Sequence, residues 1–190
     1  MMESLLLQHY GLTNTSLQKM EGYISTNYRV DSGQGRFVLK VYPIEEKEDV
    51  LAETAMIQEL DYLQANQISR PIPNSDGHLV TEIDLGGDKK ILRLLSFVEG
   101  TFLAEADHSP TLFKSIGAFI AKMDKQLLDF HHTGIKAREL SWDLQNIHVS
   151  RQLRHHVTSA EDRKLVDHFF LQWDQHVYPK MPQLRKAIIH

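Results

Sequence analysis

The sequence predicts an α+β fold of two lobes, a five-stranded antiparallel sheet with one large helix followed by a mainly helical lobe. Three observations support this prediction. Residues 35–42 alternate as a strand does, with Leu39 and Val41 on one face and Val38 and Lys40 on the other. Residues 45–66 show a helical period, and after residue 96 the apolar residues are spaced as in helices. The lobes are therefore predicted over residues 1–96 and 97–190.

The remaining elements of the first lobe follow from turn residues and short apolar runs. A short helix is expected near residues 3–10 and an extended segment over residues 17–21. Residues 21–26 connect it to a strand that starts at residue 27, and residues 31–35 form a second turn. Pro43 ends the central strand. Residues 70–73 form a rigid connection and residues 74–77 a turn, and strands over residues 78–83 and 90–97 flank a further turn.

The large helix carries a carboxylate on its apolar face. Glu53 falls near the middle of the stripe formed by Met56, Ile57, Leu60 and Leu63. A buried carboxylate without a partner costs several kcal/mol, so Lys40, on the strand just before the helix, is the expected partner. Two alternatives are that Lys40 is a surface lysine on a half-buried sheet and that the helix is rotated, which leaves Glu53 in solvent.

The second lobe is predicted from helix caps and stripes. Ser109 and Pro110 start a helix that we expect to be long and well buried. Residues 138–144 form a loop into a short helix, and Ser159 caps a further helix that Pro179 and Pro182 close. Residues 186–190 begin an apolar strand. The stripe of the first helix consists of Leu112, Ile116, Phe119, Ile120, Met123, Leu127 and Phe130.

Composition excludes several classes of function. The net charge of −4 gives no electrostatic case for binding nucleic acid or an anionic membrane. No apolar run approaches the roughly 20 residues of a membrane helix, and the start of the chain is unlike a secretory signal. The chain has no cysteine, which fits a cytoplasmic location. The eleven histidines are scattered or adjacent rather than four apart, which favours surface or capping roles over metal binding.

The order and spacing of several motifs resemble the aminoglycoside phosphotransferase and choline kinase superfamily, whose fold is protein-kinase-like. Within it, the chain is most similar to hydroxylysine kinases and to the phosphotransferase domains fused to class III aminotransferases. The residues that carry this resemblance span nearly the whole chain. They are 28–30, 37–40, Glu53, 92–95, 99–100, 109–110, 116–117, 121–125, 130–132 and 142–144.

The resemblance implies a set of nucleotide-binding residues. Lys40 would contact the α- and β-phosphates of ATP, and Glu53 would orient it. The segment from Gly22 to Thr26 would cover the phosphates and Val38 would pack on the adenine. The further expected contacts are Tyr23, Ser25 and the backbone of Ser96, Phe97 and Val98.

In this superfamily the apolar strand leads into the motif His-Gly-Asp-x-x-x-x-Asn, and His190 matches its first residue. The catalytic Asp and the Mg²⁺ ligands would follow, so the resemblance implies no catalytic or metal-binding residue within residues 1–190. We therefore expect an inactive N-terminal fragment of an ATP- and Mg²⁺-dependent kinase. Its substrate would be the hydroxyl group of an amino alcohol or a hydroxy amino acid.

Two other interpretations stay open at this point. The chain could be a non-catalytic nucleotide-binding or interaction module that ends naturally at His190. It could also be an unrelated α+β binding domain in which a Lys40–Glu53 pair is structural. The sequence indicates no oligomeric state.

Overall fold

The computed structural model describes residues 2–64, 66–137, 143–185 and 187–188. The chain forms two compact units, Met1–Lys136 with Ile188–His190 and Ala137–Ala187. The domain boundary predicted after residue 96 lies inside the first of these units. Among the described residues, no helix combines the length and the apolar character needed to cross a membrane.

The first unit contains one antiparallel sheet whose order is β1-β2-β3-β6-β4, with β5 also paired to β6. All five predicted strands form. An additional two-residue strand, β4, lies in the segment that was predicted to be a rigid connection. It forms because Pro71 and Ile72 lie beside Leu95 and Leu94 of β6. The strands are β1 (Ser16–Met20), β2 (Thr26–Ser32), β3 (Gly35–Pro43), β4 (Pro71–Ile72), β5 (Thr81–Asp84) and β6 (Lys89–Ser96).

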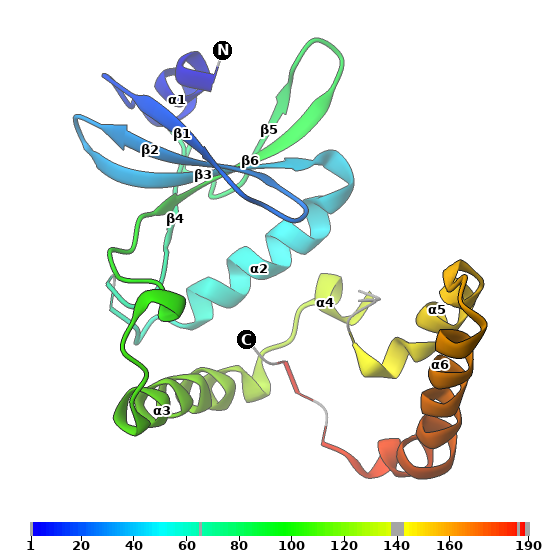
Figure 1. Cartoon of the computed structure of the whole chain (residues 1–190). Helices are drawn as coiled ribbons and strands as arrows, with labels where there is room; N and C mark the ends of the chain where they lie inside the picture. Colours follow the sequence, from blue (N-terminus) through cyan, green and yellow to red (C-terminus); the bar gives the residue numbers. More distant parts are fainter. Residues whose placement is uncertain (1, 65, 138–142, 186, 189–190) are drawn as a thin grey trace. The chain divides into compact units, whose positions relative to one another are not determined.

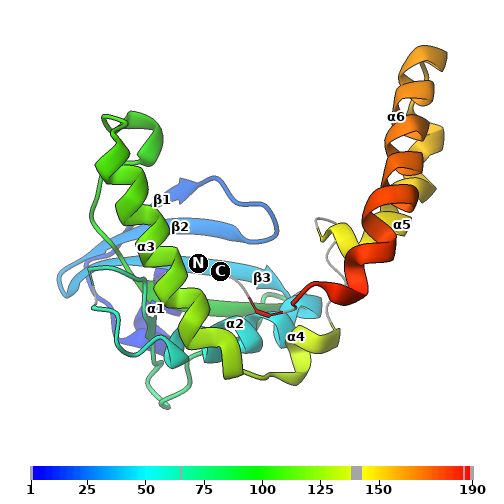
Figure 2. The same cartoon turned by 90° about the horizontal axis from the view of Figure 1, so that it is seen from below.

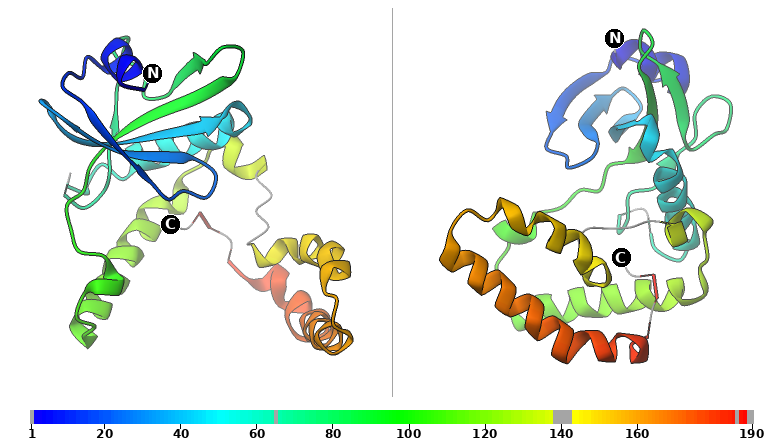
Figure 3. Two further views of the ribbon diagram at one scale, coloured as in Figure 1. Left: turned by 45° about the horizontal axis from the view of Figure 1, so that its top comes forward. Right: turned by 90° about the vertical axis from the view of Figure 1, so that its right-hand side faces the viewer.

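One face of the sheet is covered by α1 (Met2–Tyr10), as Figures 1 and 3 show. The predicted alternation of β3 is confirmed, because Leu39 and Val41 are buried on this face while Lys40 is not. Each apolar side chain removed from water stabilises the fold by about 1.5–3 kcal/mol. The core under α1 consists of Leu6, Leu12, Val30, Leu39, Val41, Ile83, Leu92 and Leu94.

The opposite face of the sheet carries α2 (Lys47–Glu59), which follows the 3-10 turn Ile44–Glu46 (Figure 1). The helix was expected to reach residue 66 but ends at Glu59. The guanidinium of Arg70 donates to the carbonyls of Ile57, Leu60 and Leu63, at 2.8, 2.5 and 2.7 Å. The first of these charge-assisted bonds satisfies a carbonyl in the last turn of the helix, and the other two hold carbonyls of the segment that follows it.

The apolar stripe predicted for α2 packs in a separate cluster of the first unit. Leu60 and Leu63 are buried there with Leu127, which follows α3 (Pro110–Gln126). The residues of α2 that are buried within the helix are instead Val50, Ala52 and Thr54. Glu53 faces the sheet as predicted, because its carboxylate reaches Arg93 of β6, but its side chain remains 35% exposed.

The cap predicted for α3 is confirmed, since the Ser109 side chain accepts from the backbone N–H of Leu112 at 3.1 Å. The prediction of a well-buried helix is wrong, because no residue of α3 is fully buried. One side packs on the cluster around Leu60, through Phe119 and Met123, while Phe113 on another side is 52% exposed. A short helix that was not predicted, α4 (Thr133–Ala137), follows.

The second unit contains α5 (Ile147–Gln152) and α6 (Ala160–Gln172), which lie side by side (Figure 2). Arg151 of α5 donates to the carbonyl of Phe170 in α6, at 3.2 Å. The predicted cap is confirmed, because the Ser159 side chain accepts from the N–H of Asp162. Further turns run over Trp173–Val177 and Tyr178–Gln183. Of the strand predicted at residues 186–190, only 187–188 are described, without regular structure, and His190 lies outside the described residues.

Candidate functional site

The sheet face that carries α2 also gathers polar side chains from three strands. In the register of the sheet, Lys40 of β3 lies between Asn27 of β2 and Arg93 of β6. The neighbouring row contains Arg29 and Val38 as a cross-strand pair. Side chains at paired positions of antiparallel strands share one face, so these residues form a single surface on the first unit.

The loop between β1 and β2 is closed by Asn27. The hydroxyl of Ser25 donates to Asn27 Oδ1 at 2.7 Å, and Asn27 Nδ2 donates to the carbonyl of Glu21 at 2.9 Å. Gly22 is required for this geometry, because a Cβ there would lie 2.0 Å from the Ser25 carbonyl oxygen and 2.7 Å from Asn27 Nδ2. The loop thus has a defined shape although it contains only one glycine.

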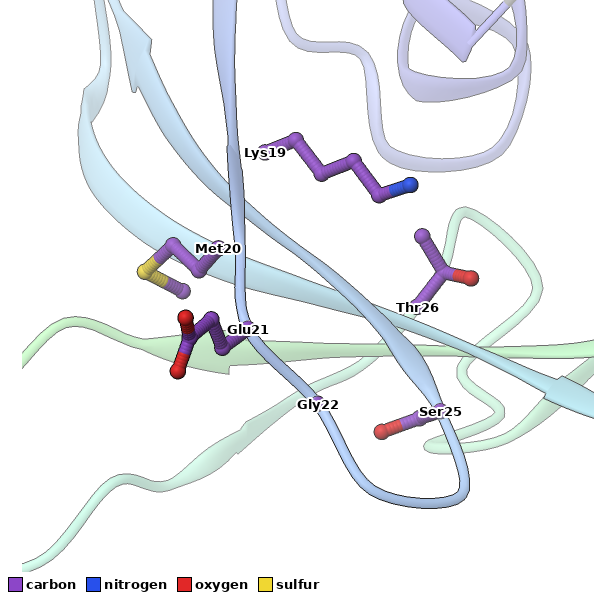
Figure 4. A pocket seen from close by; sticks show the side chains of 6 residues that line it. All are labelled: Lys19, Met20, Glu21, Gly22, Ser25 and Thr26. Carbon is purple, nitrogen blue, oxygen red and sulfur yellow. The ribbon is translucent and has the colours of Figure 1, made fainter.

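Three of the predicted loop residues line a cavity of about 580 Å³, which Figure 4 shows from close by. The hydroxyl groups of Ser25 and Thr26 and the ammonium of Lys19 lie around it. Tyr23 is 82% exposed, which is typical of a loop tip. The lining residues are Lys19, Met20, Glu21, Gly22, Ser25 and Thr26.

A second cavity, of about 610 Å³, lies where β6 leaves the sheet. Val38, Phe97 and Val98, predicted as adenine contacts, all line it. Ser96 instead accepts the backbone N–H of Arg70 with its hydroxyl, at 2.8 Å. The cavity is lined by Gln18, Met20, Arg29, Arg36, Val38, Ser69, Phe97, Val98, Glu99, Gly100, Thr101 and Phe102.

Three backbone N–H groups lie beside this cavity, and two of them already donate hydrogen bonds within the protein. The N–H of Ser96 donates to the Arg70 carbonyl at 2.8 Å, and the N–H of Phe97 donates to the Arg36 carbonyl at 3.3 Å. Within the described part of the chain, the N–H of Val98 has no such bond. Of the N–H groups of the three residues whose backbone was predicted to contact the base, the one at Val98 is therefore open to a ligand.

Charged side chains stand at the rim of the same cavity. Asp31 pairs with Arg29 and with Arg36, at 3.0 and 2.8 Å, and Arg36 also pairs with Glu99. Hydrogen bonds from Arg29 and then from Arg36 hold the pKa of the Asp31 carboxyl below its ordinary value. The two guanidinium groups lie 5.9 and 5.2 Å from the centroid of the Phe97 ring. This network holds Phe97 at the cavity mouth.

The predicted ion pair between Lys40 and Glu53 is wrong for this structure. The ion pair of Glu53 is formed with Arg93, whose Nη2 lies 2.9 Å from Oε2. The ammonium of Lys40 lies 5.5 Å from the centroid of the Tyr42 ring. The physical reason is that Arg93 stands directly beside Lys40 in the sheet and reaches the face of α2 with a wide, forked donor.

Three residues of this surface were missed by sequence analysis, namely Asn27, Tyr42 and Arg93. A signal existed for Arg93, because it interrupts the apolar run of residues 91–95. A charge in such a run is almost never buried without a partner. Asn27 and Tyr42 have no comparable signal, since their roles depend on partners in other elements or on the folded loop. Among the described residues, no group of three or more acidic or histidine side chains could hold a metal ion.

The chain is similar in sequence to a known protein family and to curated proteins. The sequence pattern of the phosphotransferase enzyme family matches residues 18–190. A hydroxylysine kinase from Danio rerio is 29% identical over 191 residues, which cover 95% of this chain and 54% of the relative. The chain thus spans about half the length of the curated relatives it matches.

Solved structures are similar in fold. An amicoumacin kinase in complex with AMP-PNP, Ca²⁺ and Ami matches with a TM-score of 0.68 at 20% identity, over 96% of this chain and 53% of that one. A microcompartment-associated aminopropanol kinase matches with a TM-score of 0.58 at 18% identity, over 76% of this chain and 45% of that one.

Proposed function

Because the chain belongs to the phosphotransferase enzyme family, we propose that it provides the nucleotide-binding part of an ATP-dependent kinase for a small molecule with a hydroxyl group. The observation that carries the proposal is the placement of Val38 and Lys40 on one face of β3. Val38 lines an apolar cavity, and Lys40 follows two residues later, about 7 Å along the strand. This arrangement suits a ligand with a flat apolar end and an anionic end.

The cavity at the end of β6 is suited to a purine base. Met20, Val38 and Phe97 supply apolar surface for the two faces of the ring. The N–H of Val98 supplies a donor for its edge, because it is the backbone donor not used within the described residues. We therefore narrow the proposed backbone contact from Ser96, Phe97 and Val98 to the N–H of Val98.

The phosphates would extend from the base toward Lys40 and the β1–β2 loop. The Lys40 ammonium would compensate part of their charge, and the loop held by Asn27 would cover them. Ser25 adds a hydroxyl donor at the loop, whereas the Thr26 side chain is paired with Val41 and lies on the face of the sheet opposite Lys40. Glu53 would act on the phosphates only indirectly, since its carboxylate is held by Arg93.

Phosphoryl transfer also requires a divalent metal and a group that orients the attacking hydroxyl. The curated relatives are about twice as long as this chain. In the family motif, the residues that bind the metal and orient the hydroxyl group follow the histidine that His190 matches. We propose that turnover depends on that part, and that residues 1–190 alone bind nucleotide weakly and do not turn over.

The acceptor is proposed to be an amino alcohol or a hydroxy amino acid. Support comes from the similarity to a hydroxylysine kinase and to an aminopropanol kinase. Both of these names describe a molecule with an amine and a hydroxyl group. An alcohol of this kind would be phosphorylated on oxygen, with ATP as donor and Mg²⁺ as the metal.

Nucleotide binding can be tested by NMR titration of the chain with ATP and with adenosine. We expect a dissociation constant for ATP in the millimolar range, about −4 kcal/mol. Lys40→Met should weaken ATP binding about tenfold, which corresponds to one lost charge-assisted bond, and leave adenosine binding unchanged. Val38→Phe should fill the cavity and weaken both ligands.

Lys89→Met is the matched control. It removes one positive charge, as Lys40→Met does, but from an exposed lysine of β6. If Lys89→Met and Lys40→Met weaken ATP equally, the ammonium of Lys40 is not a phosphate contact. If neither ligand binds, the proposed nucleotide site is wrong. ATP consumption by the 190-residue chain with hydroxylysine or 1-amino-2-propanol would contradict the proposed dependence on a further part.

A further inference from the structure

Arg93 is an unusual residue for the middle of a strand. It lies between Leu92 and Leu94 in β6, and its side chain is only 2% exposed. A guanidinium that is removed from water must be compensated by close partners, because an isolated buried charge costs several kcal/mol. The identity of those partners therefore shows what the residue does.

The partners of Arg93 come mainly from one turn of α2. Its Nη2 donates to Glu53 Oε2 at 2.9 Å and to the Tyr42 hydroxyl at 2.7 Å. Its Nη1 donates to Thr54 Oγ1 at 3.2 Å and to the Val50 carbonyl at 3.5 Å. Thr54 Oγ1 in turn donates to the Val50 carbonyl at 2.7 Å, which turns its lone pair toward Arg93.

Lys40 has a different environment on the same face. Its ammonium is 5.5 Å from the centroid of the Tyr42 ring, and the guanidinium carbon of Arg93 is 5.5 Å from the same centroid. Tyr42 thus stands next to both cations. Of these two cations, both in the described part of the chain, Arg93 forms an ion pair with Glu53 and Lys40 does not.

We propose that Arg93 is the positioning residue that anchors α2 to the sheet through Glu53, and that Lys40 does not contribute to this anchor. The anchor holds without nucleotide, because all its partners are protein groups. The part of the inference that concerns Lys40 rests on the proposed function: its ammonium is left available for phosphate instead of being bound to Glu53.

The difference between the two side chains explains this division. The planar fork of Arg93 can bond a carboxylate, two hydroxyl groups and a carbonyl at once. A lysine ammonium is a point charge on a flexible stem, so it can leave one partner for another at small cost. The rigid contact is thus made by arginine and the adjustable one by lysine.

The anchor can be tested by thermal unfolding of the 190-residue chain and a double-mutant cycle. Arg93→Met should lower Tm by about 6 °C or more, since it removes the charge-assisted hydrogen bonds to four protein groups. Arg93→Lys should recover only part of this loss. In the cycle, the effects of Arg93→Met and Glu53→Gln should be strongly non-additive, whereas those of Lys40→Met and Glu53→Gln should add.

A second measurement tests directly whether Lys40 pairs with Glu53. The rate at which a water-soluble acylating reagent modifies Lys40 is followed by mass spectrometry. Glu53→Gln should leave this rate unchanged within about twofold, the usual limit for uncoupled sites. Tyr42→Phe, which removes the acceptor hydroxyl but keeps the ring, should lower Tm and leave the Lys40 rate unchanged.

The outcomes are distinguishable. A several-fold faster modification of Lys40 in Glu53→Gln, or non-additivity of Lys40→Met with Glu53→Gln, would show that Lys40 does pair with Glu53 and would overturn the inference. An additive cycle between positions 93 and 53 would also overturn it. If Arg93→Met and Glu53→Gln are non-additive but ATP does not bind, the inference about Arg93 stands and the proposed nucleotide site is wrong.

Discussion

The contact of Arg70 with the end of α2 allows a quantitative prediction. Arg70→Met removes a guanidinium that donates to the carbonyls of Ile57, Leu60 and Leu63, and it keeps most of the aliphatic stem. The side chains of Leu60 and Leu63 are buried, so water has limited access to this end of the helix. The substitution should therefore destabilise the first unit well beyond an ordinary surface change.

The magnitude follows from the three bonds. A hydrogen bond to a charged group contributes about 1.5–3 kcal/mol, and a cation at a helix C-terminus adds about 0.3–1 kcal/mol. Because the bonds are only partly buried, water replaces some of this contribution. We expect a net loss of about 3 kcal/mol, which corresponds to a fall in Tm of about 6–12 °C for a chain of this length.

The assay is urea unfolding followed by circular dichroism, with thermal unfolding in parallel. The midpoint should fall at an unchanged m-value, because the folded surface stays the same. Lys47→Met is the matched control, since it removes a cation at the other end of α2. Its pair with Glu82 is 42% and 51% exposed, and such a pair contributes at most about 1 kcal/mol. If Arg70→Met costs no more than Lys47→Met, the capping role of Arg70 is refuted.

Two further predictions concern the loop and the cavity rim. In Gly22→Ala the new Cβ would meet the Ser25 carbonyl, so the two bonds of Asn27 should break at about 1 kcal/mol each and ATP binding should weaken. Gly117→Ala, where nothing lies within 4 Å, should instead raise Tm slightly. The pKa of Asp31 is lowered from its ordinary value of 3.8, so the stability it contributes is present above pH 3.8 and lost as the pH falls below it. The Tm difference between wild type and Asp31→Asn should therefore vanish at low pH, and a constant difference would contradict this.

Local patterns in the sequence determined most of the secondary structure. The alternation in residues 35–42 predicts which side chains of β3 face the core, because successive side chains of a strand point to opposite faces. Ser109 and Ser159 predict the first residues of two helices, because a serine hydroxyl satisfies a free N–H in the first turn. Both kinds of signal depend on residues within a few positions of each other, and both agree with the structure.

The candidate site was predicted in part. Val38, Phe97 and Val98 line one cavity, and Gly22, Ser25 and Thr26 line the other. The division of the backbone donors between Ser96, Phe97 and Val98 could not be predicted. It depends on the carbonyls of Arg36 and Arg70, which approach from other parts of the chain.

The sequence by itself determined that a lysine on β3 and a glutamate on the next helix share one face of the sheet. Only the tertiary structure decided that Glu53 pairs with Arg93, 40 residues away in the chain, and not with Lys40. An ion pair depends on distances of a few ångströms between side chains. Those distances are set by the register of β3 with β6 and by the rotation of α2, and both result from packing of the whole unit.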